Sequence, residues 1–237
     1  MKILALDSSG LVASVALVED ETLLAEYTVN YKKTHSQTLL PMLDVVAQMI
    51  ELDLNTVDGI AVAAGPGSFT GLRIGSATAK GLGLALDKPL IEVPTVDALA
   101  YNLYDTDKLI CPMMDARRQQ VYTGVYAFRD HRLEVLRPQT AAAVTEVMEW
   151  LGDYGREVVF LGDGVPVYRE LLEREMKVPY SFAPAHLNRQ RAGAVAALAA
   201  LYYKEGNVVN AREHQPQYLR LSQAERERAE KLQKKEK

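Results

Sequence analysis

The sequence is poor in cysteine and has no long apolar run, and both absences limit where the protein can act. Cys111 is the one cysteine among 237 residues, which excludes a disulfide within the chain. No apolar stretch approaches the ~20 residues that a membrane-spanning helix needs. The chain also opens without a positively charged leader ahead of an apolar run. We therefore expect a cytoplasmic protein that contacts no membrane.

The sequence also lacks an excess of positive charge. Its 27 lysines and arginines are outnumbered by 31 aspartates and glutamates, which gives a formal net charge of −4. Phosphate contacts supply much of the affinity of a nucleic-acid-binding protein, and they need a concentrated basic face. If RNA is the substrate, another subunit must hold most of it.

Familiar catalytic motifs are missing as well. Four histidines stand alone, with no cysteine partner nearby: His35, His131, His186 and His214. A metal site needs several such ligands together. Gly65-Pro-Gly67 has neither the Gly-Lys-Ser/Thr of a P-loop nor the glycine spacing of a dinucleotide-binding turn. Ser68 is not in a Gly-x-Ser-x-Gly elbow, and no His-Glu-x-x-His occurs. We predict no catalytic residue and no metal site.

Apolar runs bounded by turn residues divide the chain into two units of the same plan. In each unit an apolar run ends in an aspartate, Asp7 or Asp115, and a short turn leads into a second run. This repetition indicates a duplicated domain. We predict lobes over residues 1–105 and 106–221, followed by a charged tail over 222–237.

The period and length of the apolar pattern predict the individual elements. Strands are expected over 3–7, 12–18, 23–29, 59–64, 89–93, 110–114, 121–128 and 158–161. Helices are expected over 35–52, 69–86, 141–154, 165–176 and 191–205. A capping box from Thr34 to Gln37 should open the first helix. The expected fold class is α/β, with duplicated mixed sheets and flanking helices.

The first two helices carry more apolar surface than one sheet face can cover. Gly71, Gly75, Ala79 and Gly83 are spaced by four and form a nearly bare ridge on the second helix. The first helix is apolar over a wide arc, and such patches commonly mark protein contacts. The alternative is that the ridge packs on the protein's own sheet. The predicted partner interface comprises Leu39, Met42, Leu43, Val46, Gly71, Leu72, Gly75, Ala79 and Gly83.

Several strings resemble one known family. ILALDSS at the start, THSQTLLPML, AAGPGSFTGLRIGSATAKGL, MMDARRQQVYTGVY and the closing YLRL are similar to the TsaB (YeaZ) family, over residues 1 to about 221. The resemblance implies a two-lobed actin-like ATPase fold of the ASKHA, ribonuclease H-like type. It also implies a non-catalytic scaffold that dimerises through its first lobe with the related catalytic subunit TsaD. With the ATPase TsaE, the complex would add threonylcarbamoyl to the tRNA adenosine next to the anticodon.

ATP-using members of that fold turn backbone amides toward phosphates in the hairpin after each aspartate. Asp7, Ser8, Ser9 and Gly10 could still approach an anion, whereas Asp115-Ala-Arg-Arg118 offers bulky cationic side chains and no glycine. The alternative is that both aspartates only bond their own turns. We expect no cofactor in the isolated chain, with ATP or ADP left open at a subunit junction.

Two other functions stay open from the sequence. One is an autonomous ATP-dependent kinase of the same fold, and the other is a peptidase. When no partner is present, we expect the apolar first-lobe surface to pair with itself as a homodimer.

Overall fold

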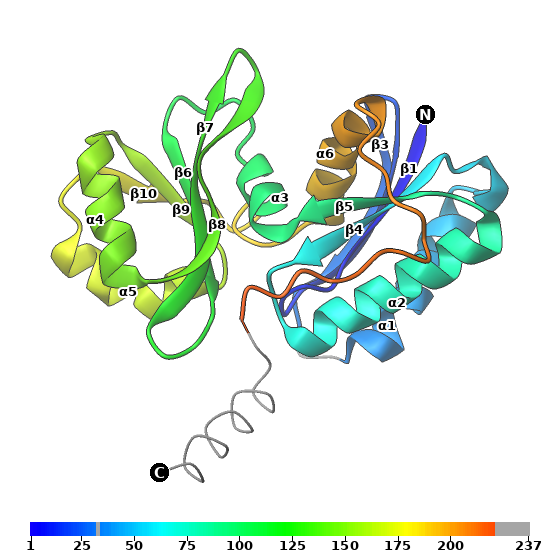
Figure 1. Cartoon of the computed structure of the whole chain (residues 1–237), viewed down its shortest axis with the longest axis horizontal. Helices are drawn as coiled ribbons and strands as arrows, with labels where there is room; N and C mark the ends of the chain where they lie inside the picture. The colour runs from blue at the N-terminus through cyan, green and yellow to red at the C-terminus, as the bar shows by residue number, and fades with distance from the viewer. Residues whose placement is uncertain (32–33, 221–237) are drawn as a thin grey trace, which may run out of the picture.

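A computed structural model describes residues 1–31 and 34–220 and arranges them in two α/β lobes (Figure 1). The charged tail predicted over 222–237 lies outside the described residues. None of the helices in the described part of the chain is long and apolar enough to cross a bilayer.

The first lobe is built on a five-stranded mixed sheet with the order β3-β2-β1-β4-β5. Its strands are β1 (Lys2–Asp7), β2 (Ala13–Glu19), β3 (Thr22–Val29), β4 (Gly59–Gly65) and β5 (Leu90–Pro94). β1 to β3 form an antiparallel meander, and β4 and β5 join it in parallel. β4 is buried along its whole length, as expected for a strand covered on both faces.

The second lobe repeats this sheet, with the order β10-β9-β6-β7-β8. Its strands are β6 (Leu109–Asp115), β7 (Gln120–Arg129), β8 (Arg132–Ala143), β9 (Val158–Leu161) and β10 (Tyr180–Phe182). β6 takes the place of β1, so Asp7 and Asp115 both end the central strand of their sheet. The predicted class, α/β with duplicated mixed sheets, is confirmed.

Helices cover both faces of both sheets. α1 (His35–Met49) and α2 (Phe69–Leu86) pack on one face of the first sheet, near the short η1 turn (Leu54–Thr56). α4 (Val144–Tyr154) and α5 (Gly164–Glu175) pack on the corresponding face of the second sheet. α3 (Thr95–Tyr101) covers the other face of the second sheet and lies between the lobes (Figure 1).

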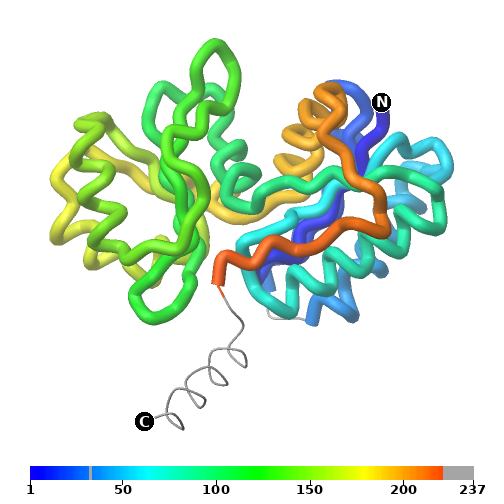
Figure 2. The backbone as a smooth tube through the Cα atoms, in the orientation of Figure 1, coloured from blue at the N-terminus to red at the C-terminus, as the bar shows by residue number. Residues whose placement is uncertain are grey.

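The helix predicted over 191–205 is α6 (Ala192–Lys204), and it belongs to the first lobe rather than the second. It covers the remaining face of the first sheet, with Ala192, Val195 and Ala199 buried against β1, β2 and β4. The following residues, 207–220, also run over the first lobe and end between the two lobes (Figure 2). The first lobe is therefore assembled from both ends of the chain.

Other predicted elements differ at their ends. The Thr34 hydroxyl accepts no capping bond from a backbone amide of α1, so the expected capping box is wrong, and the helix stops at Met49 rather than 52. The helix predicted from 141 begins at Val144, because Ala141 to Ala143 pair with β7 as the end of β8. The second helix was predicted over 69–86, and α2 has these bounds.

Candidate functional site

A cleft of about 640 Å³ lies between the lobes. The first lobe contributes the turn after β1 and the amino-terminal end of α2, including Gly10 and Ser68. The second lobe contributes the turn after β6 with Asp115 and Arg117, and the end of the described chain adds Tyr218 and Arg220. Both predicted strand-aspartate turns therefore meet at one cleft.

The first turn is organised around a buried carboxylate. Asp7 is 1 % exposed, and its Oδ1 accepts bonds from the Ser9 amide (2.9 Å) and the Ser9 hydroxyl (2.6 Å). Burial raises the pKa of Asp7 above its ordinary value, against the opposing effect of the Ser9 bonds. Ser8 Oγ donates to the Gly71 carbonyl at 2.8 Å, so this turn is fastened to α2. Ser9 and Gly10 line the cleft, and an anion site there stays a prediction.

The second turn presents an ion pair to the cleft. Arg117 Nη1 lies 3.1 Å from Asp115 Oδ2, while the Arg117 amide donates to Asp115 Oδ1 at 2.9 Å. Asp163 Oδ1 accepts from the Asp115 amide at 3.1 Å, and burial raises the pKa of Asp163. Arg117, Arg118 and Gln119 all have positive φ, a backbone conformation that residues other than glycine rarely adopt. This turn lacks the open backbone that a phosphate cradle uses.

The side chains of His35 and Cys111 are engaged or buried. No group of three or more His, Cys, Asp or Glu side chains in residues 1–31 and 34–220 is arranged to hold a metal ion. His35, which lines the cleft, has its Nε2 bound to the Gly10 carbonyl at 2.8 Å. Cys111 is fully buried, and burial raises the pKa of its thiol to about 12. The prediction that the chain has no catalytic residue stays a prediction.

The nine residues predicted to contact a partner lie inside the first lobe. Leu39, Met42, Leu43 and Val46 are buried in its core, as are Leu72 and the small residues of the α2 ridge. A Cβ added to Gly71 would lie 2.0 Å from the Ser8 carbonyl oxygen, and one on Gly83 would lie 2.9 Å from the Cβ of Ala211. The interface interpretation of this ridge needs correction, because the turn after β1 and the carboxyl-terminal segment fill the space beside it.

A second stripe on α2 faces outward instead. Ala77, Gly81 and Ala85 are spaced by four and exposed, and a Cβ on Gly81 would meet nothing within 4 Å. We define the outer face as seven exposed residues of α1 and α2. They are Ala77, Gly81 and Ala85, together with the large apolar side chains Leu40 (53 %), Val45 (41 %), Met49 (80 %) and Leu84 (52 %). Sequence reasoning missed this stripe because small residues recur on both sides of α2. The available signal was Gly81, a glycine inside the helix that lies outside the predicted ridge.

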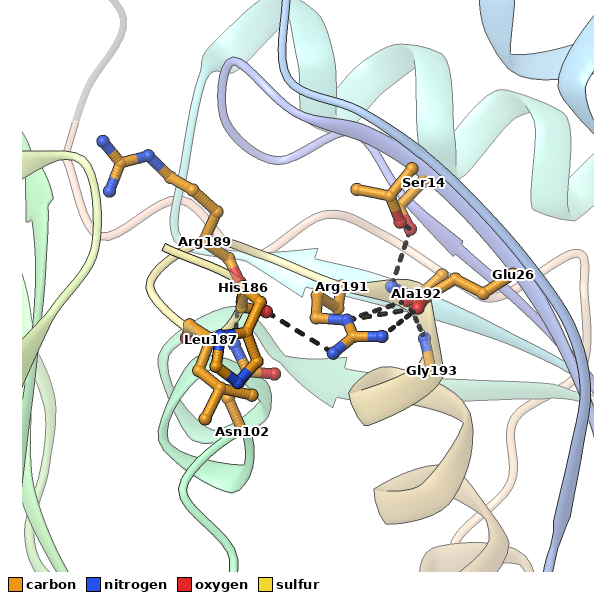
Figure 3. A network of polar contacts seen from close by, with 10 residues as sticks. Ser14, Glu26, Asn102, His186, Leu187, Arg189, Arg191, Ala192 and Gly193 are labelled. Carbon is orange, nitrogen blue, oxygen red and sulfur yellow. Dashed lines mark hydrogen bonds and ion pairs between the residues drawn. The ribbon is translucent and has the colours of Figure 1, made fainter. Parts of the chain in front are cut away.

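The segment that returns from the second lobe to the first is held by a polar network (Figure 3). Asn102 Nδ2 donates to the carbonyls of Leu187 (3.0 Å) and Arg189 (2.7 Å). These bonds join the end of α3 to the segment between β10 and α6. Arg191 forms an ion pair with Glu26 of β3. The segment between β10 and α6 is therefore held firmly where it passes from the second lobe to the first.

Comparison with known proteins identifies the family. Residues 22–228 match the family model described as TsaD, tRNA N6-adenosine threonylcarbamoyltransferase. The Bacillus subtilis tRNA threonylcarbamoyladenosine biosynthesis protein TsaB is 34 % identical over 95 % of this chain and 96 % of its own length.

Solved structures from Pseudomonas aeruginosa are similar along nearly their whole length. YeaZ has a TM-score of 0.76 at 28 % identity, and a protein described as similar to the peptidase YeaZ has 0.80 at 27 %. Each alignment covers 92 % of this chain and 99 % of the other. The chain therefore belongs to the TsaB (YeaZ) family, whose curated members are named for tRNA threonylcarbamoyladenosine biosynthesis.

Proposed function

We propose that this chain is a non-catalytic subunit of a tRNA-modifying complex and that it docks the catalytic subunit TsaD through the outer face. TsaD would transfer the threonylcarbamoyl group to the N6 amine of the adenosine next to the anticodon. TsaE would act on the assembled complex, and tRNA would be held by the complex rather than by this chain alone. ATP or ADP would bind at a subunit junction, and the isolated chain would form a homodimer.

The exposure of the outer face carries the proposal. Four large apolar side chains are left uncovered on two neighbouring helices, although the core beneath them is complete. The bare stripe at Ala77, Gly81 and Ala85 allows another helix to approach at the short end of the usual ~8–10 Å separation. A related protein with a similar helix pair could bury this surface in a bundle of four helices.

The cleft supports a subunit without chemistry of its own. The carboxylate of Asp7 bonds its own turn, and Arg117 already pairs with Asp115. An autonomous kinase would have to bind ATP there in the isolated chain. Calorimetric titration with ATP and Mg²⁺ separates the two functions, because tight binding by the chain alone would favour the kinase.

A bulky side chain at Gly81 tests the docking surface. We expect Gly81→Leu to leave the isolated fold intact, because open space surrounds this position. Overpacking a close helix contact costs about 1–3 kcal/mol, which corresponds to a roughly 5- to 150-fold loss of affinity for TsaD by isothermal titration calorimetry.

The matched control is Gly152→Leu in α4 of the second lobe, where an added Cβ also meets nothing within 4 Å. This variant should bind TsaD as the wild type does. Equal affinity in the wild type and Gly81→Leu would move the interface away from the outer face.

A further inference from the structure

The segment after α6, residues 207–220, runs over the first lobe and ends between the two lobes (Figure 2). We call it the strap, and its last three residues line the cleft. Val209 pairs with Leu90 of β5 through two backbone bonds of 2.9 Å. Ala211 and His214 are buried, and His214 Nδ1 lies 2.5 Å from Glu92 Oε1. Lys80 of α2 donates to the carbonyl of His214 at 2.9 Å. The strap is thus anchored on the first lobe up to residue 214.

Beyond this anchor the strap becomes exposed and reaches the start of α2. The Gln217 amide donates to the Ala64 carbonyl at 2.7 Å. The Tyr218 ring lies 4.8 Å from that of Phe69, and the Arg73 guanidinium lies 4.1 Å from the Phe69 ring centre. Tyr218 is nevertheless 40 % exposed. Segments with few buried contacts open locally at low cost.

The end of the strap touches the opposite lobe. Arg220 Nη1 donates to the Ala116 carbonyl at 2.6 Å, directly before the run of positive φ in the second turn. Gln139 of β8 donates to the Gly65 carbonyl at 3.3 Å and lies 3.5 Å from Gln217 Oε1. These polar contacts join the two lobes, and the Arg220 contact lies at the cleft, which no residue of α3 lines.

We propose that residues 217–220 are a latch that sets the width of the cleft. α3 is buried against the second sheet and also packs on α6, so it forms a firm connection on the far side. Three of the four latch residues are exposed, Arg220 is half-buried, and a few polar bonds hold them, so this is the side that can release. Detachment of Arg220 and Gln139 would let the lobes separate about α3 and widen the cleft.

Distances between spin labels on the two lobes test the latch in the full-length chain. Labels at Gln37 of α1 and Glu149 of α4 occupy exposed positions, and buried Cys111 stays unlabelled. We expect Arg220→Ala to shift the electron–electron resonance distance distribution to longer values. The loss of one charge-assisted hydrogen bond should raise the ratio of open to closed molecules roughly tenfold. Gln139→Ala should shift the distribution in the same direction.

Arg212→Ala is the matched control, because Arg212 is an exposed arginine of the same strap and its backbone carbonyl still accepts from Lys80. It should retain the wild-type distance distribution. Thermal unfolding of each labelled protein verifies that the lobes remain folded. The latch is refuted if Arg220→Ala and Gln139→Ala both keep the wild-type distribution, or if Arg212→Ala shifts it equally.

Discussion

Two glycines of α2, ten residues apart, face opposite environments. Gly71 lies under the turn after β1, where an added Cβ would come within 2.0 Å of the Ser8 carbonyl oxygen. Gly81 faces open space on the outer face. The same substitution should therefore have opposite effects on the stability of the fold at the two positions.

We expect Gly71→Ala to lower the free energy of unfolding by about 1–3 kcal/mol, because the clashing atom belongs to the backbone and cannot move aside cheaply. Gly81→Ala should raise it by up to about 1 kcal/mol, the usual gain in a helix interior. Urea unfolding of both variants measures the difference. Two variants of equal stability would contradict the packing described for this ridge.

Replacement of Asp7 should change how stability depends on pH. Burial raises the pKa of Asp7 above its ordinary value of 3.8, so the folded chain keeps this proton to a higher pH than the unfolded chain. Wild-type stability should then fall as pH rises from about 4 to the folded pKa, since the folded state binds more protons in that window. Asp7→Asn removes this loss and keeps an acceptor for Ser9. The variant should be the more stable protein at pH 8.

Urea unfolding at several pH values between 4 and 8 checks this expectation. The stability advantage of Asp7→Asn should shrink toward pH 4, because the wild-type carboxyl is then protonated in the folded state and becomes increasingly protonated in the unfolded state. An advantage for the wild type at pH 8 would contradict the assignment and would indicate a partner that compensates the buried charge.

The amino-terminal end of α6 is capped by side chains from two strands of the first lobe. Ser14 Oγ of β2 accepts from the Ala192 amide at 2.8 Å, and Glu26 Oε1 of β3 accepts from the Gly193 amide at 3.0 Å (Figure 3). Arg191 itself provides no side-chain cap. The helix is thus oriented by residues more than 160 positions earlier.

Removal of these caps should loosen α6. Ser14→Ala is expected to cost about 1–2 kcal/mol of unfolding free energy, because it leaves the buried Ala192 amide without its acceptor. Glu26→Gln should also destabilise, since it weakens the contact with partly exposed Arg191. Hydrogen exchange should accelerate at the first turn of α6 in both variants. Unchanged exchange there would show that the caps contribute little.

Elements with a strong local pattern could be predicted from the sequence, and those that depend on pairing could not. α2 and β9 have the bounds expected from their apolar runs. β8 was missed because its exposed and half-buried residues give no clean alternation, and its alanines favour a helix until β7 pairs with them. α3 has seven residues and β10 three, too few to show a period.

At the scale of the whole molecule, the duplication was visible and the exchange of segments between the lobes was not. Asp7 and Asp115 mark equivalent turns, and the structure brings both to one cleft. The sequence placed residues 191–205 with the second lobe because they follow it in the chain. The first sheet needs a cover for its second face, and α6 supplies it. An apolar helix could cover either sheet, so its sequence alone does not assign it to a lobe. The residues that cap α6 belong to the first lobe, and they make the assignment.

The boundary between the lobes can be tested with two fragments. α3 precedes the predicted boundary at residue 106, yet Val96 and Leu99 bury the face of the second sheet that carries Ile110, Tyr126 and Leu161. The Asp97 carboxylate accepts from the Tyr126 hydroxyl at 2.7 Å, so a polar bond also joins α3 to this sheet. The second lobe therefore requires α3 as part of its own core.

We expect a fragment of residues 95–186 to unfold cooperatively, because it retains both faces of the second sheet. A fragment of residues 106–186 lacks α3 and should expose the apolar side chains of that face to water. Because burial contributes roughly 25 cal/mol per Å² of apolar area and folded domains are only marginally stable, we expect the shorter fragment to lose its cooperative transition. Near-ultraviolet circular dichroism during heating distinguishes the two fragments. If the shorter fragment gave an equally sharp transition, α3 would be a linker between the lobes rather than part of the second core.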